Sequence, residues 1–267
     1  MKKISIVIMS TIFLSLFSAS PFGQSQNEVD PSGLIMEGKN MIQSGVDQWM
    51  LNVLLNSRGI FERILSIREK DYLSHYYLAY ADYRLCIMYL SQKDEKSASK
   101  YLDEGVKHLE KSIELKPNFA ESQALLASLY GFKIGLKWYL GMTLGPKAGT
   151  CFDKAVEVDS LNPRVYLLLG ISKYHTPSLF GGGMDKAKLN LLKSIKLYES
   201  YSVSDSLLPD WGYEETYAWL GKIYMEEKEY QKAEEQFEKA LQINPKCSWV
   251  KYVLKKELED KTKIKNQ

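Results

Sequence analysis

The sequence predicts an all-helical protein built from consecutive helix-turn-helix repeats. Apolar residues recur at helical spacing in successive segments, and the passage from Glu214 to Pro245 carries the small and aromatic positions of a closely packed helical pair. No window shows the sustained period-two alternation of a half-buried strand. A composition of 45% hydrophobic and 25% charged residues over 267 positions is typical of a globular protein.

The N-terminus predicts a secretory signal peptide over residues 1–23. Two lysines precede the apolar run 4–17, and small residues follow it, with cleavage expected near Gly23. No cysteine lies near the cut, so we expect a periplasmic or secreted protein without a lipid anchor. An uncleaved anchor is the alternative, but the run is shorter than the roughly 20 residues that span a bilayer, so no stable membrane insertion is expected after signal removal. Residues 24–37, rich in polar residues, are predicted to be a flexible leader.

Charge and metal-ligand residues exclude several classes of partner. Loss of Lys2 and Lys3 with the signal leaves 35 − 2 = 33 basic residues against 33 acidic ones, which gives no support to a nucleic-acid partner. The three cysteines form no C-x-x-C pair and the three histidines are scattered, so no zinc site is expected. The three cysteines are Cys86, Cys151 and Cys247, and whether two of them form a disulfide stays open.

The passage from Glu214 to Pro245 supplies the strongest repeat. Its first helix carries Leu220 and Gly221, and its second carries an alanine, a phenylalanine and an alanine at i, i+4 and i+7. Pro245 then ends the second helix. The full set of matching positions is Tyr217, Leu220, Gly221, Tyr224, Ala233, Phe237, Ala240 and Pro245. This passage resembles a tetratricopeptide repeat, and the resemblance implies a right-handed superhelical solenoid.

One such repeat cannot bury its own apolar face, so neighbours are expected. The register gives five helical pairs over 38–247, starting near Gly38, Tyr72, Phe119, Arg164 and Glu214. Residues 248–267 are predicted to be a C-terminal capping helix and tail. Insertions fall near Ser91–Ser99, Gly135–Pro146 and Phe180–Gly183, and whether the last two shape a binding site stays open.

No catalytic constellation is present, so we expect no enzyme activity and no cofactor. Gly181–Gly183 lack the preceding strand and the Gly-Lys-Ser/Thr run of a phosphate loop. Carboxylates between Glu226 and Glu238 alternate with lysines at helical spacing, which indicates a solvated, ion-paired face. The sequence contains no G-x-S-x-G elbow.

The resemblance implies that first helices line a concave, ligand-facing wall. Tyr76, Tyr80 and Tyr83 form a stripe there, although they could instead be buried between repeats. The candidate ligand-binding residues are Trp49, Tyr76, Tyr80, Tyr83, Glu121, Arg164, Tyr174 and Lys222, and the same register includes Lys39 and Glu215. Chaperone-binding members carry an asparagine that clamps a carboxylate; here its places hold Gln43, Tyr77, Leu125, Leu168 and Trp219, so that clamp is not expected.

These observations predict a non-catalytic scaffold that binds a protein or peptide on its concave face, in the periplasm or outside the cell. The alternative is a periplasmic accessory component of a solute transporter that binds a small ligand or a transporter subunit. An open trough favours the scaffold and a closed pocket favours the transporter component. Self-association stays open.

Overall fold

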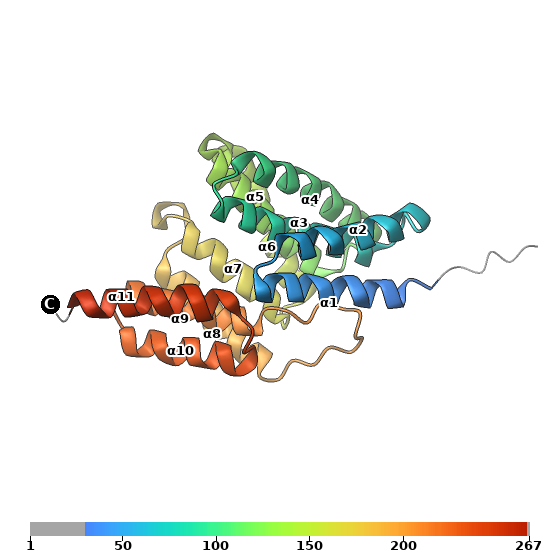
Figure 1. Ribbon diagram of the computed structural model, residues 1–267. Helices are drawn as coiled ribbons and strands as arrows, with labels where there is room; N and C mark the ends of the chain where they lie inside the picture. The colour runs from blue at the N-terminus through green and yellow to red at the C-terminus, as the bar shows by residue number, and fades with distance from the viewer. Residues whose placement is uncertain (1–29, 266–267) are drawn as a thin grey trace, which may run out of the picture. The chain divides into compact units, whose positions relative to one another are not determined.

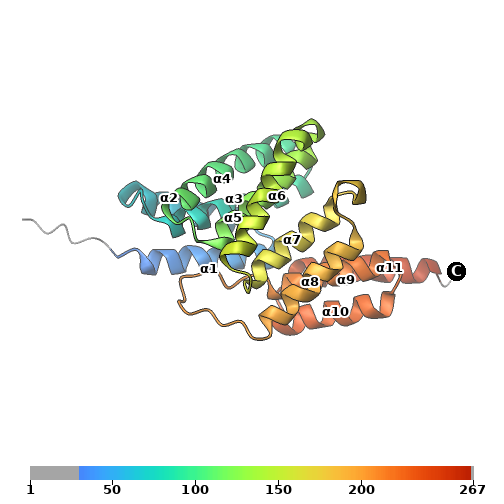
Figure 2. The ribbon, with the colours of Figure 1, turned by 180° about the vertical axis from the view of Figure 1, so that it is seen from behind.

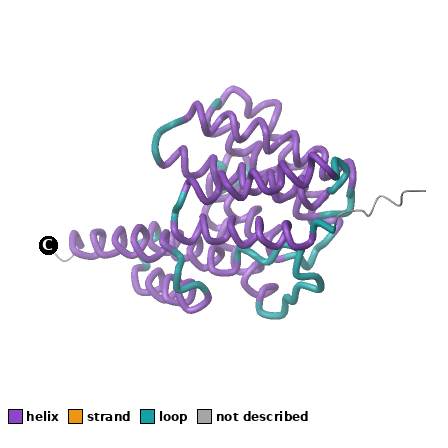
Figure 3. The backbone as a smooth tube through the Cα atoms, turned by 45° about the vertical axis from the view of Figure 1, so that its right-hand side comes forward, coloured by secondary structure: helices purple, strands orange, loops and turns teal. Residues whose placement is uncertain are grey.

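The computed structural model describes residues 30–265, and residues 31–265 belong to one compact unit. Figure 3 shows helices joined by loops, and no strand occurs in the described range. The predicted signal peptide, residues 1–23, and the start of the predicted leader lie outside that range. Between residues 30 and 265, no helix is both long and apolar enough to cross a membrane.

Five helical pairs follow one another along the chain (Figure 1). They are α1 (Ser32–Gln48) with α2 (Leu51–Ile67), α3 (Tyr72–Ser91) with α4 (Glu95–Leu115), α5 (Ala120–Leu136) with α6 (Gly141–Val158), α7 (Pro163–His175) with α8 (Met184–Tyr198), and α9 (Tyr213–Glu226) with α10 (Tyr230–Ile243). A π-helical turn, Trp249–Leu254, and α11 (Lys255–Lys265) complete the described chain. The predicted all-helical repeat fold is confirmed.

Local sequence signals set the helix boundaries. The Asp71 carboxylate accepts a hydrogen bond from the Leu73 amide at 3.1 Å and caps α3, and Asp94 does the same for the Ser97 amide at 3.0 Å in α4. Within the last pair, a Cβ at Gly221 would lie 2.5 Å from the Phe237 ring. Only glycine therefore permits this close approach of α9 and α10.

One sequence prediction needs correction. The predicted leader, 24–37, overlaps α1, which begins at Ser32 because Ile35 and Ile42 already form its buried stripe. The extra residues predicted near Ser91–Ser99 lengthen α3 and α4, and only a short turn capped by Asp94 separates the two helices.

The two histidines nearest in space lie on α3 and α4. The Nδ1 atoms of His75 and His108 are 3.0 Å apart, and the His75 Nε2 lies 2.9 Å from the Glu69 carbonyl oxygen. Burial first, and then the neighbouring His75, lower the pKa of His108 to about 4. Both rings are therefore neutral near pH 7.

Successive first helices contact one another, α1 with α3, α3 with α5, and α5 with α7, and they form one wall of the solenoid. Residues 199–212, which connect α8 to α9, return as an irregular segment beside α1 (Figures 1 and 2). We call residues 199–212 the plug, because Trp211 near their end is buried against this wall, on Tyr76 and Tyr80 of α3.

Candidate functional site

The plug is held along its main chain by α1. Lys39 Nζ donates to the carbonyl oxygens of Ser206 at 2.7 Å and Leu208 at 2.8 Å, and it pairs with the Asp210 carboxylate at 2.9 Å. One lysine on the first helical pair thus fixes a turn that is about 170 residues away in sequence, in which the Leu208 amide donates to the Asp205 carbonyl. Two of its contacts go to main-chain carbonyls of this turn and the third goes to the Asp210 side chain.

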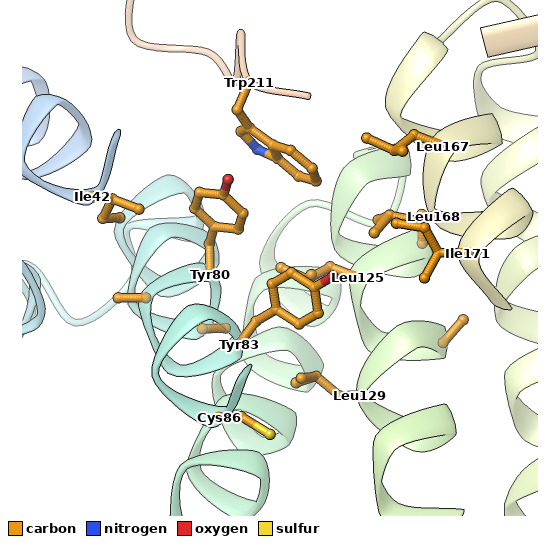
Figure 4. Close-up of a cluster of buried hydrophobic side chains, with 14 of the residues drawn as sticks. Ile42, Tyr80, Tyr83, Cys86, Leu125, Leu129, Leu167, Leu168, Ile171 and Trp211 are labelled. Carbon is orange, nitrogen blue, oxygen red and sulfur yellow. The ribbon is translucent and has the colours of Figure 1, made fainter. Parts of the chain in front are cut away.

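Trp211 anchors the plug in the wall. Its ring stacks on Tyr80 with centroids 4.6 Å apart, and its Nε1 donates to the Tyr76 hydroxyl at 3.0 Å. Figure 4 shows the indole between Tyr80 of α3 and Leu167 of α7. Only 5% of Trp211 is exposed, so the indole is a core side chain supplied by a loop.

The plug is also fastened at its middle and at its end. The Tyr77 hydroxyl donates to the Leu207 carbonyl at 2.6 Å, and the Tyr198 hydroxyl donates to the Trp211 carbonyl at 2.7 Å. Gly212 follows with φ of 105°, and a Cβ there would lie 2.6 Å from the Tyr198 hydroxyl. Glycine is therefore required where the plug turns into α9.

A buried ion pair joins α3 to α9 beside the indole. Arg84 donates from Nη1 and Nη2 to the two carboxylate oxygens of Glu215, at 3.1 and 2.5 Å. Its guanidinium carbon also lies 5.0 to 5.3 Å from the ring centres of Tyr80, Tyr83 and Trp211. Burial opposes the charge, but Glu215 and the neighbouring phenols outweigh it and raise the pKa of Arg84.

A second buried guanidinium is incompletely paired. Arg164 is 1% exposed, and its Nη2 donates to Glu121 Oε1 at 3.0 Å and to the Tyr201 hydroxyl at 2.6 Å. Its Nε and Nη1 have no hydrogen-bond partner. Tyr201 belongs to the plug, and its ring centre lies 4.9 Å from the guanidinium carbon. The plug therefore covers a cation that retains unused donors.

The structure separates the predicted ligand-binding residues into two groups. Tyr76, Tyr80, Tyr83, Glu121 and Arg164 are 0 to 7% exposed, because the plug and the neighbouring helices cover them. Burial raises the pKa of all three tyrosines, so their hydroxyls stay neutral hydrogen-bonding groups. The second group, Trp49, Tyr174 and Lys222, reaches the surface. Ligand contact by either group stays a prediction.

Tyr174 belongs to a partly exposed aromatic cluster at the C-terminal end of the wall, formed by Tyr174, His175, Trp219 and Trp249. The Trp219 ring centre lies 5.3 Å from that of Tyr174, 5.5 Å from that of His175 and 5.3 Å from that of Trp249. Lys222 Nζ lies 5.9 Å from the Tyr174 ring centre, and Trp219 Nε1 has no hydrogen-bond partner. This cluster can stack on a flat or apolar group.

An open cleft of about 480 Å³ lies where the first and last repeats meet. Asp47 Oδ1 accepts from Gln43 Nε2 at 2.9 Å and from Asn244 Nδ2 at 2.7 Å, which ties α1 to the turn after α10. Burial raises the pKa of Glu214 at its wall. The cleft is lined by Gln43, Asp47, Asp210, Trp211, Glu214, Ile243, Asn244, Pro245 and Lys246.

No group of acidic, histidine or cysteine side chains in residues 30–265 could hold a metal ion, and Cys86, Cys151 and Cys247 are free thiols.

The sequence analysis missed two residues of this site, Arg84 of the wall and Trp211 of the plug. Trp211 lies outside the repeat register, and the only signal was a tryptophan set between Pro209-Asp210 and Gly212 in a connection longer than a helical turn needs.

Comparison with known proteins now adds to this geometry. Residues 214–247, which include most of α9 and all of α10, match the family described as Tetratricopeptide repeat. The chain has a tetratricopeptide-repeat fold. This fold is consistent with a protein-binding role. The resemblance predicted from Leu220, Gly221 and Phe237 is therefore confirmed.

Two solved structures are similar to this chain in fold. The HusA haemophore from Porphyromonas gingivalis has a TM-score of 0.63 and 22% identity, over 75% of this chain and 96% of that one. TTC0263, a thermophilic TPR protein in Thermus thermophilus, has a TM-score of 0.55 and 19% identity, over 80% of this chain and 95% of that one. No curated protein matches the sequence. At these identities the similarity describes the fold.

Proposed function

We propose that the mature protein is a non-catalytic scaffold that binds a peptide segment of a protein partner along its concave face. The observation that carries the proposal is that this wall already holds a non-helical segment, the plug, through donors aimed at main-chain carbonyls. Lys39 and Tyr77 make these contacts, while Tyr80 provides a stacking surface for an aromatic side chain. Main-chain contacts combined with one side-chain slot are a recurring way to bind peptides.

We also propose that the protein acts in the periplasm or outside the cell. The support is the pattern of residues 1–23, in which lysines, an apolar run and small residues follow one another. Fractionation of the source cell, with an antibody against the α10 sequence, tests this part alone. Recovery in the cytoplasm with an intact N-terminus would contradict it.

The binding proposal is tested with a random peptide library displayed against residues 24–267. We expect enriched peptides to protect α1 and α3 amides from hydrogen exchange, and Lys39→Met to weaken their binding at least about ten-fold. Lys137→Met, at an exposed lysine outside the plugged wall, is the matched control and leaves affinity unchanged. Protection confined to other surfaces, or no enriched peptide, would refute the proposal.

A second candidate function is that of a transporter accessory component that binds a small planar ligand. Two observations favour it: the similarity in fold to a haemophore, and the partly exposed cluster in which Tyr174 and His175 adjoin Trp219. Tyrosine and histidine are both haem-iron ligands, and Lys222 could pair with a carboxylate of such a ligand. Titration with haemin, followed by the Soret band, tests it. Loss of the shifted band in Tyr174→Phe and His175→Gln is expected, and an unshifted band in the unaltered protein would refute it.

A further inference from the structure

We propose that the plug is an internal occupant of the peptide site, and that the partner segment which replaces it carries an acidic residue followed by an aromatic one, as Asp210 and Trp211 do. This inference rests on the proposed function and specifies its ligand. The plug then shows which chemistry the concave wall selects.

The aromatic requirement comes from the slot that Trp211 occupies. The slot offers a stacking face at Tyr80, a hydroxyl acceptor at Tyr76 and a cation at Arg84, all contacting one indole. An aliphatic side chain would fill part of the volume but would use neither the stacking face nor the cation. Tryptophan uses all three partners.

The acidic requirement comes from the charges that face the plug. Lys39, which is only 9% exposed, already pairs with Asp210, whose side chain is 57% exposed. Arg164 lies beneath Tyr201 with Nε and Nη1 unpartnered, although it is 1% exposed. A replacing segment that places a carboxylate where the Tyr201 hydroxyl now lies would give the Arg164 Nη2 a charged acceptor in place of a neutral one.

Part of the plug is open to solvent and part is held firmly. It contains no helix and its stretch Ser204–Ser206 is exposed, whereas Lys39, Tyr77 and the slot of Trp211 hold the rest. Because it is tethered at both ends, its effective concentration at the wall is on the order of millimolar. An external segment must therefore compete against the plug, and weakening the plug should reveal the site.

The experiment uses a fluorescent peptide with the sequence of residues 199–212 and the mature chain. Binding is measured by fluorescence anisotropy to the unaltered protein and to Trp211→Ala, in which the slot is vacated. We expect the peptide to bind Trp211→Ala at least about ten-fold more tightly than the unaltered protein. The same peptide with alanine in place of its tryptophan should lose this gain. Trp138→Ala, which changes an 84% exposed tryptophan, is the matched control and should behave as the unaltered protein.

A second opened form protects the test against misfolding of Trp211→Ala. A protease site inserted between Ser204 and Asp205, both exposed, allows the plug to be cut without changing any wall residue. Peptide binding that appears only after cleavage supports the inference. Loss of this binding when Lys39→Met is added shows that the peptide binds to the wall.

Each negative outcome has one meaning. If neither opened form binds the peptide while the unaltered protein still binds library peptides, the inference is wrong and the proposed function stands. If no peptide from either source binds, both are wrong. Light scattering tests a third possibility. If the unaltered protein or Trp138→Ala forms a dimer and the free peptide dissociates that dimer, the occupant is the plug of a second copy, and the assignment to a foreign segment is overturned.

Discussion

Replacing Trp211 with alanine measures how far the plug contributes to the stability of the whole solenoid. The residue is only 5% exposed, and its side chain makes a stacking contact, a hydrogen bond and a cation contact. Truncation of a buried tryptophan to alanine costs about 3–5 kcal/mol. We therefore expect Trp211→Ala to lower the free energy of unfolding by about 4 kcal/mol.

The assay is guanidinium denaturation followed by far-ultraviolet circular dichroism. Trp211→Phe keeps a stacking ring but leaves the Tyr76 hydroxyl without its indole donor, so a smaller loss of about 1–2 kcal/mol is expected. If the plug leaves the wall in the native Trp211→Ala protein, the denaturant slope also falls, because less surface is exposed on unfolding.

Trp138→Ala is the control for this prediction, because it removes the same atoms from a side chain that is 84% exposed. Its free energy of unfolding should change by no more than about 0.5 kcal/mol. Equal losses in Trp138→Ala and Trp211→Ala, or a loss below about 1 kcal/mol in Trp211→Ala, would refute the view that the plug is part of the core.

Three further predictions concern the wall and the repeats. Glu215→Gln leaves the buried charge of Arg84 without its counter-charge and should cost about 3 kcal/mol in guanidinium denaturation; an unchanged midpoint would contradict the ion pair. Because burial and a neighbouring imidazole hold the pKa of folded His108 at about 4, below the roughly 6.5 of an unfolded histidine, the unfolded chain binds more protons between these values. The contribution of His108 to the free energy of unfolding should be fully present above about pH 6.5 and should fall by about 2 kcal/mol, after allowance for solvent screening, as the pH drops towards 4. His108→Gln should flatten this part of the dependence of the melting temperature on pH. Gly221→Ala should lower the melting temperature through a clash worth about 1–3 kcal/mol, whereas Gly59→Ala, in a helix with open space around the new methyl, should raise it slightly.

The repeats were predictable because their signals are periodic. A glycine lies at the close approach of the two helices in four of the five pairs, and the α5–α6 pair lacks one. The four glycines are Gly38, Gly105, Gly170 and Gly221. The repeat pattern located extra residues near Ser91–Ser99 but did not give their conformation, which is helical: they lengthen α3 and α4. Helix ends depend on capping by Asp94, which a repeat pattern does not contain.

The covered wall was not predictable in the same way. The register placed Tyr76, Tyr80 and Arg164 on the concave side, but their burial depends on residues 199–212, which carry no periodicity. A segment without a repeat gives no indication of where it returns, since its position is fixed by single contacts such as those of Lys39 and Trp211. These contacts join parts of the chain more than about 100 residues apart.

Arg164 distinguishes a purely structural plug from an occupant of a binding site. Trp211 and Lys39 find their partners within the plug and the wall, and their contacts alone would be explained by stability. A buried guanidinium with unpartnered Nε and Nη1 is different, because unsatisfied buried donors lower stability and are rare in folded proteins. The plug places one acceptor beside Arg164, the Tyr201 hydroxyl, but this acceptor is neutral and bonds only to Nη2. A segment of another chain that bears a carboxylate at this place would offer the guanidinium a charged acceptor, which is the preference expected of an occupant's site.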